Sequence, residues 1–345
     1  MKEYPFVTAM IVVRNEEKYI EECLRSLLEQ SYPANRYEVL VVDGLSDDKT
    51  ITIAKETEEK YSSRKWENGE TETKVSVRYL QNPKKILASG WNIGIKEALG
   101  DYVVRIDAHA SADKDFILKS VETILQIGDA VCVGGSMKTE AISPKGQLIA
   151  NVLSSPFGIG NSKFRYSQKA QYTDTVAFGL YKKEIFSQVG YFDETLSRNQ
   201  DNDMHGRIRN AGGKFYLNPE IKSTYHPRET VKSMANQAFN NGRWNILTFR
   251  KDPKSLSVRH LVPLLFVMGI LGCLILGFIN FHFWILLLAV LGLHFTIGIT
   301  FAAKKTASIG KMLLTSFLFF LLHLSYGLGS LISLSSKRNK GGNVK

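Results

Sequence analysis

The sequence predicts an α/β domain built on a mainly parallel sheet, followed by apolar helices that enter a membrane. In residues 1–255, short apolar stretches alternate with segments whose apolar residues recur at helical spacing. From Leu261 onward the chain is instead dominated by Leu, Ile, Phe and Gly. Strands that alternate with helices of about 10–15 residues imply right-handed crossovers, which align neighbouring strands in parallel.

Five apolar stretches are predicted as strands. The first is apolar at nearly every position, which is typical of a strand buried in a core. The five cover Phe6–Val13, Tyr37–Val42, Val75–Leu80, Tyr102–Ile106 and Val131–Gly135.

The segments between these strands are predicted as helices, because each places apolar residues on one helical face. Ser46 or Asp47 is expected to cap the second helix. Residues 62–74, rich in Ser, Glu, Lys and Thr, are expected to form a solvated connection. The apolar faces of the first, third and fourth helices consist of Ile20, Cys23, Leu24, Leu27 and Leu28; of Trp91, Ile95, Ala98 and Leu99; and of Phe116, Ile117, Val121, Ile124 and Leu125.

Three apolar runs near the end of the chain are predicted to lie in a membrane. Leu261–Ile279, Phe281–Ala303 and Met312–Leu334 contain no Lys, Arg, Asp or Glu. Each approaches the roughly 20 residues that cross a bilayer. A buried helix of a soluble protein would normally keep one polar face.

The net charge of +11 is explained by basic residues beside these runs. This pattern is typical of contact with anionic lipid head groups on the cytoplasmic side. A basic stripe interleaved with aromatic residues is missing from residues 1–255, so nucleic acid is not expected as a partner. The flanking basic residues are Arg250, Lys251, Lys254, Arg259, Lys304, Lys305, Lys311, Lys337, Arg338, Lys340 and Lys345.

We therefore expect a cytosolic domain over 1–255, a membrane region with about three hydrophobic helices over 256–336 and a basic tail over 337–345. The short apolar run at Phe6–Val13 leads into charged residues and does not resemble a signal peptide. Three spans would place the basic tail outside, against the charge rule. An interfacial or re-entrant segment, or a tight hairpin at residues 279–282, therefore remains open.

Polar side chains follow the ends of four predicted strands. Asn15 and Glu16 follow the first, Asp43 the second, Asn82 the third and Asp107 the fourth. Each alone fits a helix cap. Because ligands of open parallel sheets bind beyond the carboxyl ends of the strands, the set favours a ligand site.

Asp107 and His109, in "GDYVVRIDAHA", are candidate ligands for a divalent cation. Mg²⁺ or Mn²⁺ would take oxygen ligands there and bridge to phosphate. Neither GxGxxG nor GxxxxGK[ST] follows the first strand, so a nucleotide diphosphate would need the metal to neutralise it. Asp43 is placed to accept hydrogen bonds from a base or a ribose.

Four segments resemble the family 2 inverting glycosyltransferases of the GT-A fold, over about residues 5–250. The resemblance is closest to the membrane-anchored members such as the succinoglycan glucosyltransferases. The segments are "VVRNEEKYIEECLRSLLEQSYP", "EVLVVDGLSDDKT", "ASGWNIGIKEALGDYVVRIDAHA" and "FGLYKKEIFSQVGYFDETLSRNQDNDMHGRIRNAGGKFY".

The resemblance implies a role for each matching residue. Asp201 would be the catalytic base, and Asp107, His109 and His226 would hold Mg²⁺ or Mn²⁺. The donor-binding residues would be Val13, Asn15, Glu16, Asp43, Asn92 and Asp107. The contacts to acceptor or diphosphate would be Asp203, Arg228, Arg243 and Trp244.

Three positions depart from the family pattern. His109 replaces the usual second Asp, Gln200 replaces the Glu of a Glu-Asp pair, and Asn240 stands where processive relatives carry Gln. The residues alone also allow simpler interpretations. Asp201 and Asp203 would favourably meet a helix dipole or, with His205, Asp201 would form a metal pair. His226 would be structural, and Arg243 with Trp244 would anchor the chain at a membrane interface.

The expected activity is transfer of a sugar from a nucleotide diphosphate sugar, preferably a UDP-sugar, to a lipid-linked saccharide or polysaccharide. Inversion at the anomeric carbon would form a β-linkage. The expected location is the cytoplasmic membrane, with the catalytic domain facing the cytosol. Two alternatives are a processive polysaccharide synthase and a non-catalytic module that binds nucleotide sugar.

Overall fold

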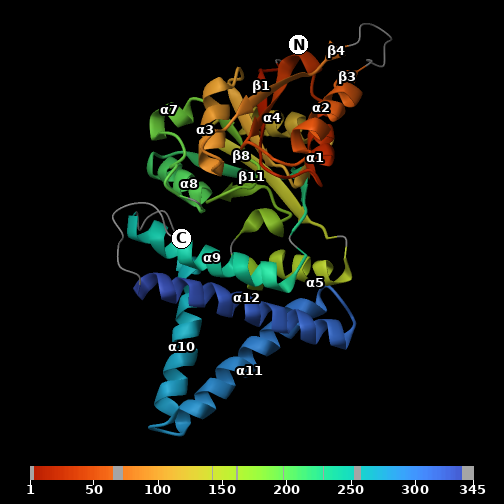
Figure 1. Cartoon of the computed structure of the whole chain (residues 1–345). Coiled ribbons are helices and arrows are strands. Elements are labelled where there is room, and N and C mark those ends of the chain that lie inside the picture. Colours follow the sequence, from red (N-terminus) through yellow and green to blue (C-terminus); the bar gives the residue numbers. More distant parts are fainter. Residues whose placement is uncertain are drawn as a thin grey trace. The chain divides into compact units, whose positions relative to one another are not determined.

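The computed structural model describes residues 4–64, 73–141, 143–160, 162–196, 198–227, 229–251 and 258–335. The chain forms two compact units (Figure 1). We call Met1–Lys138 with Lys163–His226 the α/β unit, and Thr139–Ser162 with Pro227–Lys345 the helical unit. The helical unit thus includes two segments that precede residue 256. The boundary between cytosolic and membrane residues near 255 stays a prediction, since contacts alone do not test it.

The sheet of the α/β unit positions the strand ends that the sequence singled out. Four strands run parallel in the order β5-β2-β1-β6. Their register pairs Val13 with Asp43 and Val12 with Asp107, so the carboxyl ends lie at one edge. These strands are β1 (Val7–Val13), β2 (Tyr37–Asp43), β5 (Ser76–Gln81) and β6 (Tyr102–Asp107).

The rest of the sheet is mixed rather than parallel. β10 (Leu180–Lys182) inserts between β6 and β8 (Ala130–Thr139) and is antiparallel to both. β11 (Lys214–Tyr225) follows β8 in the sheet order and pairs antiparallel with two short strands. Those are β7 (Ala110–Ala112) and β9 (Gln171–Thr173). A separate antiparallel pair, β3 (Ser63–Arg64) and β4 (Thr73–Lys74), lies in the connection predicted at 62–74.

Helices cover both faces of this sheet (Figure 1). α1 (Ile20–Leu28), α2 (Thr50–Tyr61) and α4 (Phe116–Ile127) share one core cluster with the strands. α3 (Leu87–Glu97), α7 (Ile185–Val189) and α8 (Gln200–Asn210) share the other. Short 3₁₀ turns occur at Ala34–Arg36 and Lys163–Arg165.

The predicted apolar faces are buried, with two corrections. All five residues of the first face are fully buried. Leu99 and Leu125 are 67% and 51% exposed, because α3 ends at Glu97 and Leu125 faces away from the core. The predicted cap of the second helix is also wrong. α2 begins at Thr50, and Ser46 instead donates a hydrogen bond to Asp43.

In the helical unit, α12 (Ile309–Ser335) packs against every other helix. These are α5 (Pro144–Leu153), α6 (Pro156–Ile159), α9 (Val231–Lys251), α10 (Val262–Gly277) and α11 (His282–Ala303), and a 3₁₀ turn at Val258–Leu261 precedes α10. Among the described residues, α11 and α12 are long and apolar enough to cross a membrane, whereas α10 has only 16 residues. The three predicted runs therefore form three helices, of which two are candidate spans.

Candidate active site

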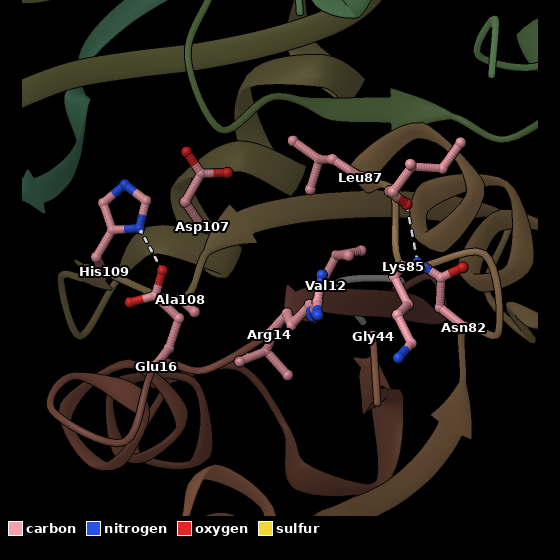
Figure 2. A pocket seen from close by; sticks show the side chains of 12 residues that line it. Val12, Arg14, Glu16, Gly44, Asn82, Lys85, Leu87, Asp107, Ala108 and His109 are labelled. Carbon is pink, nitrogen blue, oxygen red and sulfur yellow. Dashed lines mark hydrogen bonds and ion pairs between the residues drawn. The ribbon is translucent and has the colours of Figure 1, made fainter. Parts of the chain in front are cut away.

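A cavity of about 250 Å³ lies at the carboxyl ends of the parallel strands. It brings together polar side chains that are far apart in the sequence, as the strand-end pattern predicted (Figure 2). Gly44, directly after β2, lets the chain pass close to Arg14. The lining consists of Val12, Val13, Arg14, Glu16, Gly44, Asn82, Lys85, Ile86, Leu87, Asp107, Ala108 and His109.

One side of the cavity is acidic. Figure 2 shows Asp107, His109 and Glu16 together, and the Nδ1 of His109 lies 3.5 Å from the Oε1 of Glu16. Burial raises the pKa of the Asp107 carboxyl, and the neighbouring His109 and Arg105 offset this only in part. A carboxylate in this setting is stabilised by an added positive charge.

The donor set of this acidic side fits a divalent cation that is shared with a substrate. Asp107 and His109 offer one oxygen and one nitrogen donor, with Glu16 close by. Within the part of the chain that the structure describes, no three His, Cys, Asp or Glu side chains are grouped to hold a metal alone. Magnesium sites in phosphate chemistry often use one or two protein ligands and complete the shell with substrate phosphates and water.

The opposite side of the cavity carries two cations that the sequence analysis did not single out. Figure 2 shows the Arg14 guanidinium between the acidic side and Lys85. Lys85 has a left-handed backbone, with φ at 59°. The Nδ2 of Asn82 holds this turn by donating to the Ile86 carbonyl at 2.8 Å. Strained backbone of this kind is enriched at ligand sites.

Asn15 and Asp43 brace the loops beside the cavity. Asp43 accepts from the Ser46 hydroxyl at 2.6 Å, and Asn15 accepts from the Asp47 amide at 3.1 Å. The amide of Glu16 donates to Thr50 at 2.8 Å. Neither Asn15 nor Asp43 is among the lining residues, although Val13 and Glu16 are. The contacts predicted for Asn15 and Asp43 stay predictions.

Asn92 lies outside the cavity lining and is 6% exposed. Its amide group exchanges two 2.9 Å hydrogen bonds with the backbone of Phe192 and donates to Glu194 at 3.0 Å. This arrangement ties α3 to the segment that precedes α8. The contact of Asn92 with the donor stays a prediction. The observed hydrogen bonds favour a role in positioning α3.

Asp201, in the first turn of α8, forms an ion pair with Arg105. The Arg105 side chain is only 8% exposed and lies 4.0 Å over the Trp91 ring. Burial acts to raise the pKa of Asp201, but the charge and hydrogen bond of Arg105 outweigh it, so this pKa is lowered. Arg105 and Asp107 lie two residues apart on β6 and therefore on one face of the sheet. The ion pair with Arg105 thus fixes Asp201 to β6, the strand that ends at the cavity.

Asp203 has a different environment from Asp201. Its Oδ2 accepts from the Nε and Nη2 of Arg207 at 3.0 and 2.9 Å. Arg207 also donates to the carbonyls of Val189, Gly190 and Tyr191. Asp203 therefore holds α8 against the loop after α7.

The metal pair of Asp201 with His205 is not supported. Both ring nitrogens of His205 are engaged, Nδ1 with Thr175 at 2.8 Å and Nε2 with Tyr181 at 2.6 Å. Burial lowers the pKa of His205 to about 3, so its ring is neutral near pH 7. His205 is a hydrogen-bonded core residue.

The remaining predicted site residues fall in three places. The amide of His226 donates to the His109 carbonyl at 3.1 Å, which puts it beside the acidic side of the cavity. Its ring stacks on Tyr19, and its Nε2 lies 3.4 Å from Glu22.

Arg228 lies outside the described residues. Arg243 and Trp244 belong to α9 of the helical unit, and their roles stay predictions.

Comparison with known proteins identifies the family of this chain. The family model for glycosyl transferase family 2 matches residues 8–190. A protein of Methanococcus voltae, dolichyl N-acetyl-alpha-D-glucosaminyl phosphate 3-beta-D-2,3-diacetamido-2,3-dideoxy-beta-D-glucuronosyltransferase, is 30% identical over 281 residues, which cover 80% of this chain and 83% of the relative. Succinoglycan biosynthesis protein ExoA of Rhizobium meliloti (strain 1021) is 29% identical over 269 residues, 76% of each chain.

A solved structure shares the fold. Mannosyltransferase PcManGT from Pyrobaculum calidifontis, in complex with GDP-Man and Mn²⁺, superimposes with a TM-score of 0.56 and 17% identity. The match covers 97% of this chain and 88% of that chain. At this identity the likeness supports the fold alone, which is GT-A. Because the family model covers more than half of the sequence, the chain belongs to glycosyltransferase family 2.

Proposed function

We propose that this chain is an inverting, metal-dependent glycosyltransferase. It moves a sugar from a nucleotide diphosphate sugar, in the first place a UDP-sugar, to a lipid-linked saccharide or polysaccharide. It works at the cytoplasmic membrane, with its catalytic domain facing the cytosol. The observation that carries the proposal is the cavity at the strand ends, where Asp107 and His109 face Arg14 and Lys85 in a family 2 domain.

The two sides of the cavity have different roles in binding the donor. Asp107 and His109, with His226 beside them, hold the divalent ion, and Arg14 and Lys85 attract the negatively charged diphosphate. The bound ion would neutralise the charge that develops on the leaving diphosphate. Val13 and Glu16 line the nucleotide end, and the braced loops of Asn15 and Asp43 keep its shape.

Asp201 takes the proton of the acceptor. The acceptor oxygen attacks the anomeric carbon while the bond from that carbon to the diphosphate oxygen breaks. Asp201 accepts the hydroxyl proton, and the electron pair leaves with the diphosphate. A single displacement of this kind inverts the anomeric carbon, so an α-linked donor gives a β-linkage. Arg105 lowers the pKa of Asp201, so the carboxylate is ionised at neutral pH.

The acceptor is proposed to be a lipid-linked saccharide. The name of the Methanococcus voltae relative specifies a dolichyl-linked sugar phosphate, which agrees with a lipid-linked acceptor. Arg228, Arg243 and Trp244 are proposed as contacts to acceptor or diphosphate. Asp203 contributes through Arg207, which fixes the loop beside α8.

A donor screen tests the proposal. Tritium-labelled UDP-, GDP- and TDP-sugars are offered to membranes that contain the full chain, and lipid extracts of each reaction are counted. We expect label from one nucleotide sugar to enter the lipid extract or a larger saccharide, and EDTA to prevent this.

Two further results would separate the proposal from its alternatives. A ladder of long products on a gel would instead identify a processive synthase. Donor binding without any transfer or hydrolysis, over a range of lipid-linked acceptors, would favour a non-catalytic module and contradict the proposal.

A further inference from the structure

The two faces of α12 differ in a way that does not fit a helix surrounded by lipid. One face is a continuous apolar stripe at helical spacing, exposed or half-buried along its length. The opposite face is covered and carries polar and small residues, among them Thr315, Ser330 and Gly329. The stripe consists of Leu313, Leu314, Phe317, Leu321, Leu324, Leu328 and Ile332.

The covered face of α12 packs against helices that contain polar and charged residues. α9 runs alongside, where Asn245 hydrogen-bonds Tyr326 and Arg250 donates to the Leu334 carbonyl at 2.7 Å. A Cβ on Gly329 would overlap the Phe239 backbone of α9, so the two helices are in close contact. α5 joins the same cluster through Ile149.

The middle of α12 touches a segment that returns to the α/β unit within a few residues. His323, near the centre of the helix, lies 2.9 Å from the Phe157 carbonyl in α6. α6 ends at Ile159, and the α/β unit resumes at Lys163. If α12 crossed the bilayer, its centre would lie at the midplane of the bilayer, and α6 would have to lie there as well. The hydrogen bond of His323 to His294, at 3.0 Å, would also lie there, where histidines are costly.

α12 crosses only the base of the α10–α11 hairpin (Figure 1). Gly327 packs against Pro263 and Val267 near the start of α10. Ser316 donates to the Phe295 carbonyl at 3.0 Å, towards the end of α11. α12 therefore contacts the start of α10 and the end part of α11, which together form the open end of the hairpin. The closed end, at the turn between α10 and α11, lies beyond these contacts.

The closed end of the hairpin is too short to cross a bilayer. α10 continues from Met268 to Gly277 for about 15 Å past Val267, which packs against Gly327 of α12, whereas the hydrocarbon core is about 30 Å thick. This end carries exposed apolar side chains and no charge, including Phe278 at 85% and Ile279 at 79% exposure. It suits the interior of one leaflet.

We propose that the helical unit is a monotopic anchor. The α10–α11 hairpin enters one leaflet of an anionic bilayer without crossing it, and α12 lies in the plane of the head groups with its apolar stripe in the lipid. The exposed Lys304, Lys305 and Lys311 then contact the same anionic surface as the basic tail at 337–345. Both ends of the chain lie on one side, so the basic tail no longer conflicts with the charge rule.

The sidedness of the termini tests this inference and needs no transferase activity. The full chain carries one epitope before Met1 and another after Lys345, and sealed vesicles of both orientations are treated with protease. We expect both epitopes to be digested in one orientation and both to be protected in the other. Protection of one epitope with digestion of the other would overturn the inference.

Chemical labelling at the tip of the hairpin gives a second test. In an Asn280→Cys variant, a membrane-impermeant maleimide is expected to label residue 280 from neither face, whereas Lys311→Cys labels from the face that exposes the termini. The wild-type chain measures the background from Cys23, Cys132 and Cys273, all of which are buried. Labelling of residue 280 from the opposite face would show a crossing hairpin. Release of the wild-type chain by alkaline carbonate would exclude membrane insertion altogether.

Discussion

Asp201→Asn is expected to lower turnover by about 10²- to 10⁴-fold while leaving donor affinity nearly unchanged. Asn keeps the shape of the side chain and removes the proton acceptor. Turnover and donor affinity are measured separately, by initial rates at saturating donor and by calorimetry. Because Arg105 lowers the pKa of Asp201, protonation of this carboxylate should limit the rate only when the pH falls below the ordinary Asp range.

Asp203→Asn is the matched control for this prediction, since it lies on the same helix two residues away. Asp203 is 5% exposed and accepts two hydrogen bonds from Arg207. Its loss should lower the melting temperature, because Arg207 loses the anionic partner through which α8 is held against the loop after α7. An inactive, stable Asp203→Asn beside a fully active Asp201→Asn would mean that the base is the other carboxylate.

Asp107→Ala is expected to abolish the gain in donor affinity that Mn²⁺ brings. Asp107 is the carboxylate at the end of β6 that is proposed to hold the metal, and the Glu16 carboxylate beside it is paired with His109. The measurement is calorimetric titration of UDP and of the preferred nucleotide sugar, with and without Mn²⁺.

The control for this second prediction lies at the other end of the same strand. Asp101 is exposed and directly precedes β6, so Asp101→Ala removes an equal charge far from the cavity. It should bind donor as the wild type does, with the same response to Mn²⁺. An unchanged metal response in Asp107→Ala would remove Asp107 from the metal site.

The sequence predicted the elements that position the site because their signals are local. Apolar stretches at 7–13, 37–43 and 102–107 form parallel strands, and parallel register alone brings Asp107 level with Val12. From there the meeting of Glu16, Asn82, Asp107 and His109 in one cavity follows. The ordered motifs also predicted the family.

What the sequence did not predict depends on contacts between distant segments. The ion pair of Arg105 with Asp201 joins β6 to α8, and neither residue indicates its partner through spacing. Arg14 and Lys85 enter the cavity from two different loops. A signal for Lys85 was present in Asn82, three residues earlier, which caps the turn. The apolar run of α12 forms one of the two candidate spans, but its composition does not reveal that α9 and α5 cover one of its faces.

The stereochemical course of transfer tests the central claim most directly. The product made from an α-linked nucleotide sugar is isolated, and the configuration of its new glycosidic bond is read by NMR before any second reaction occurs. A single displacement assisted by Asp201 predicts a β-linkage. An α-linkage would show retention and contradict a mechanism in which Asp201 acts only as a base.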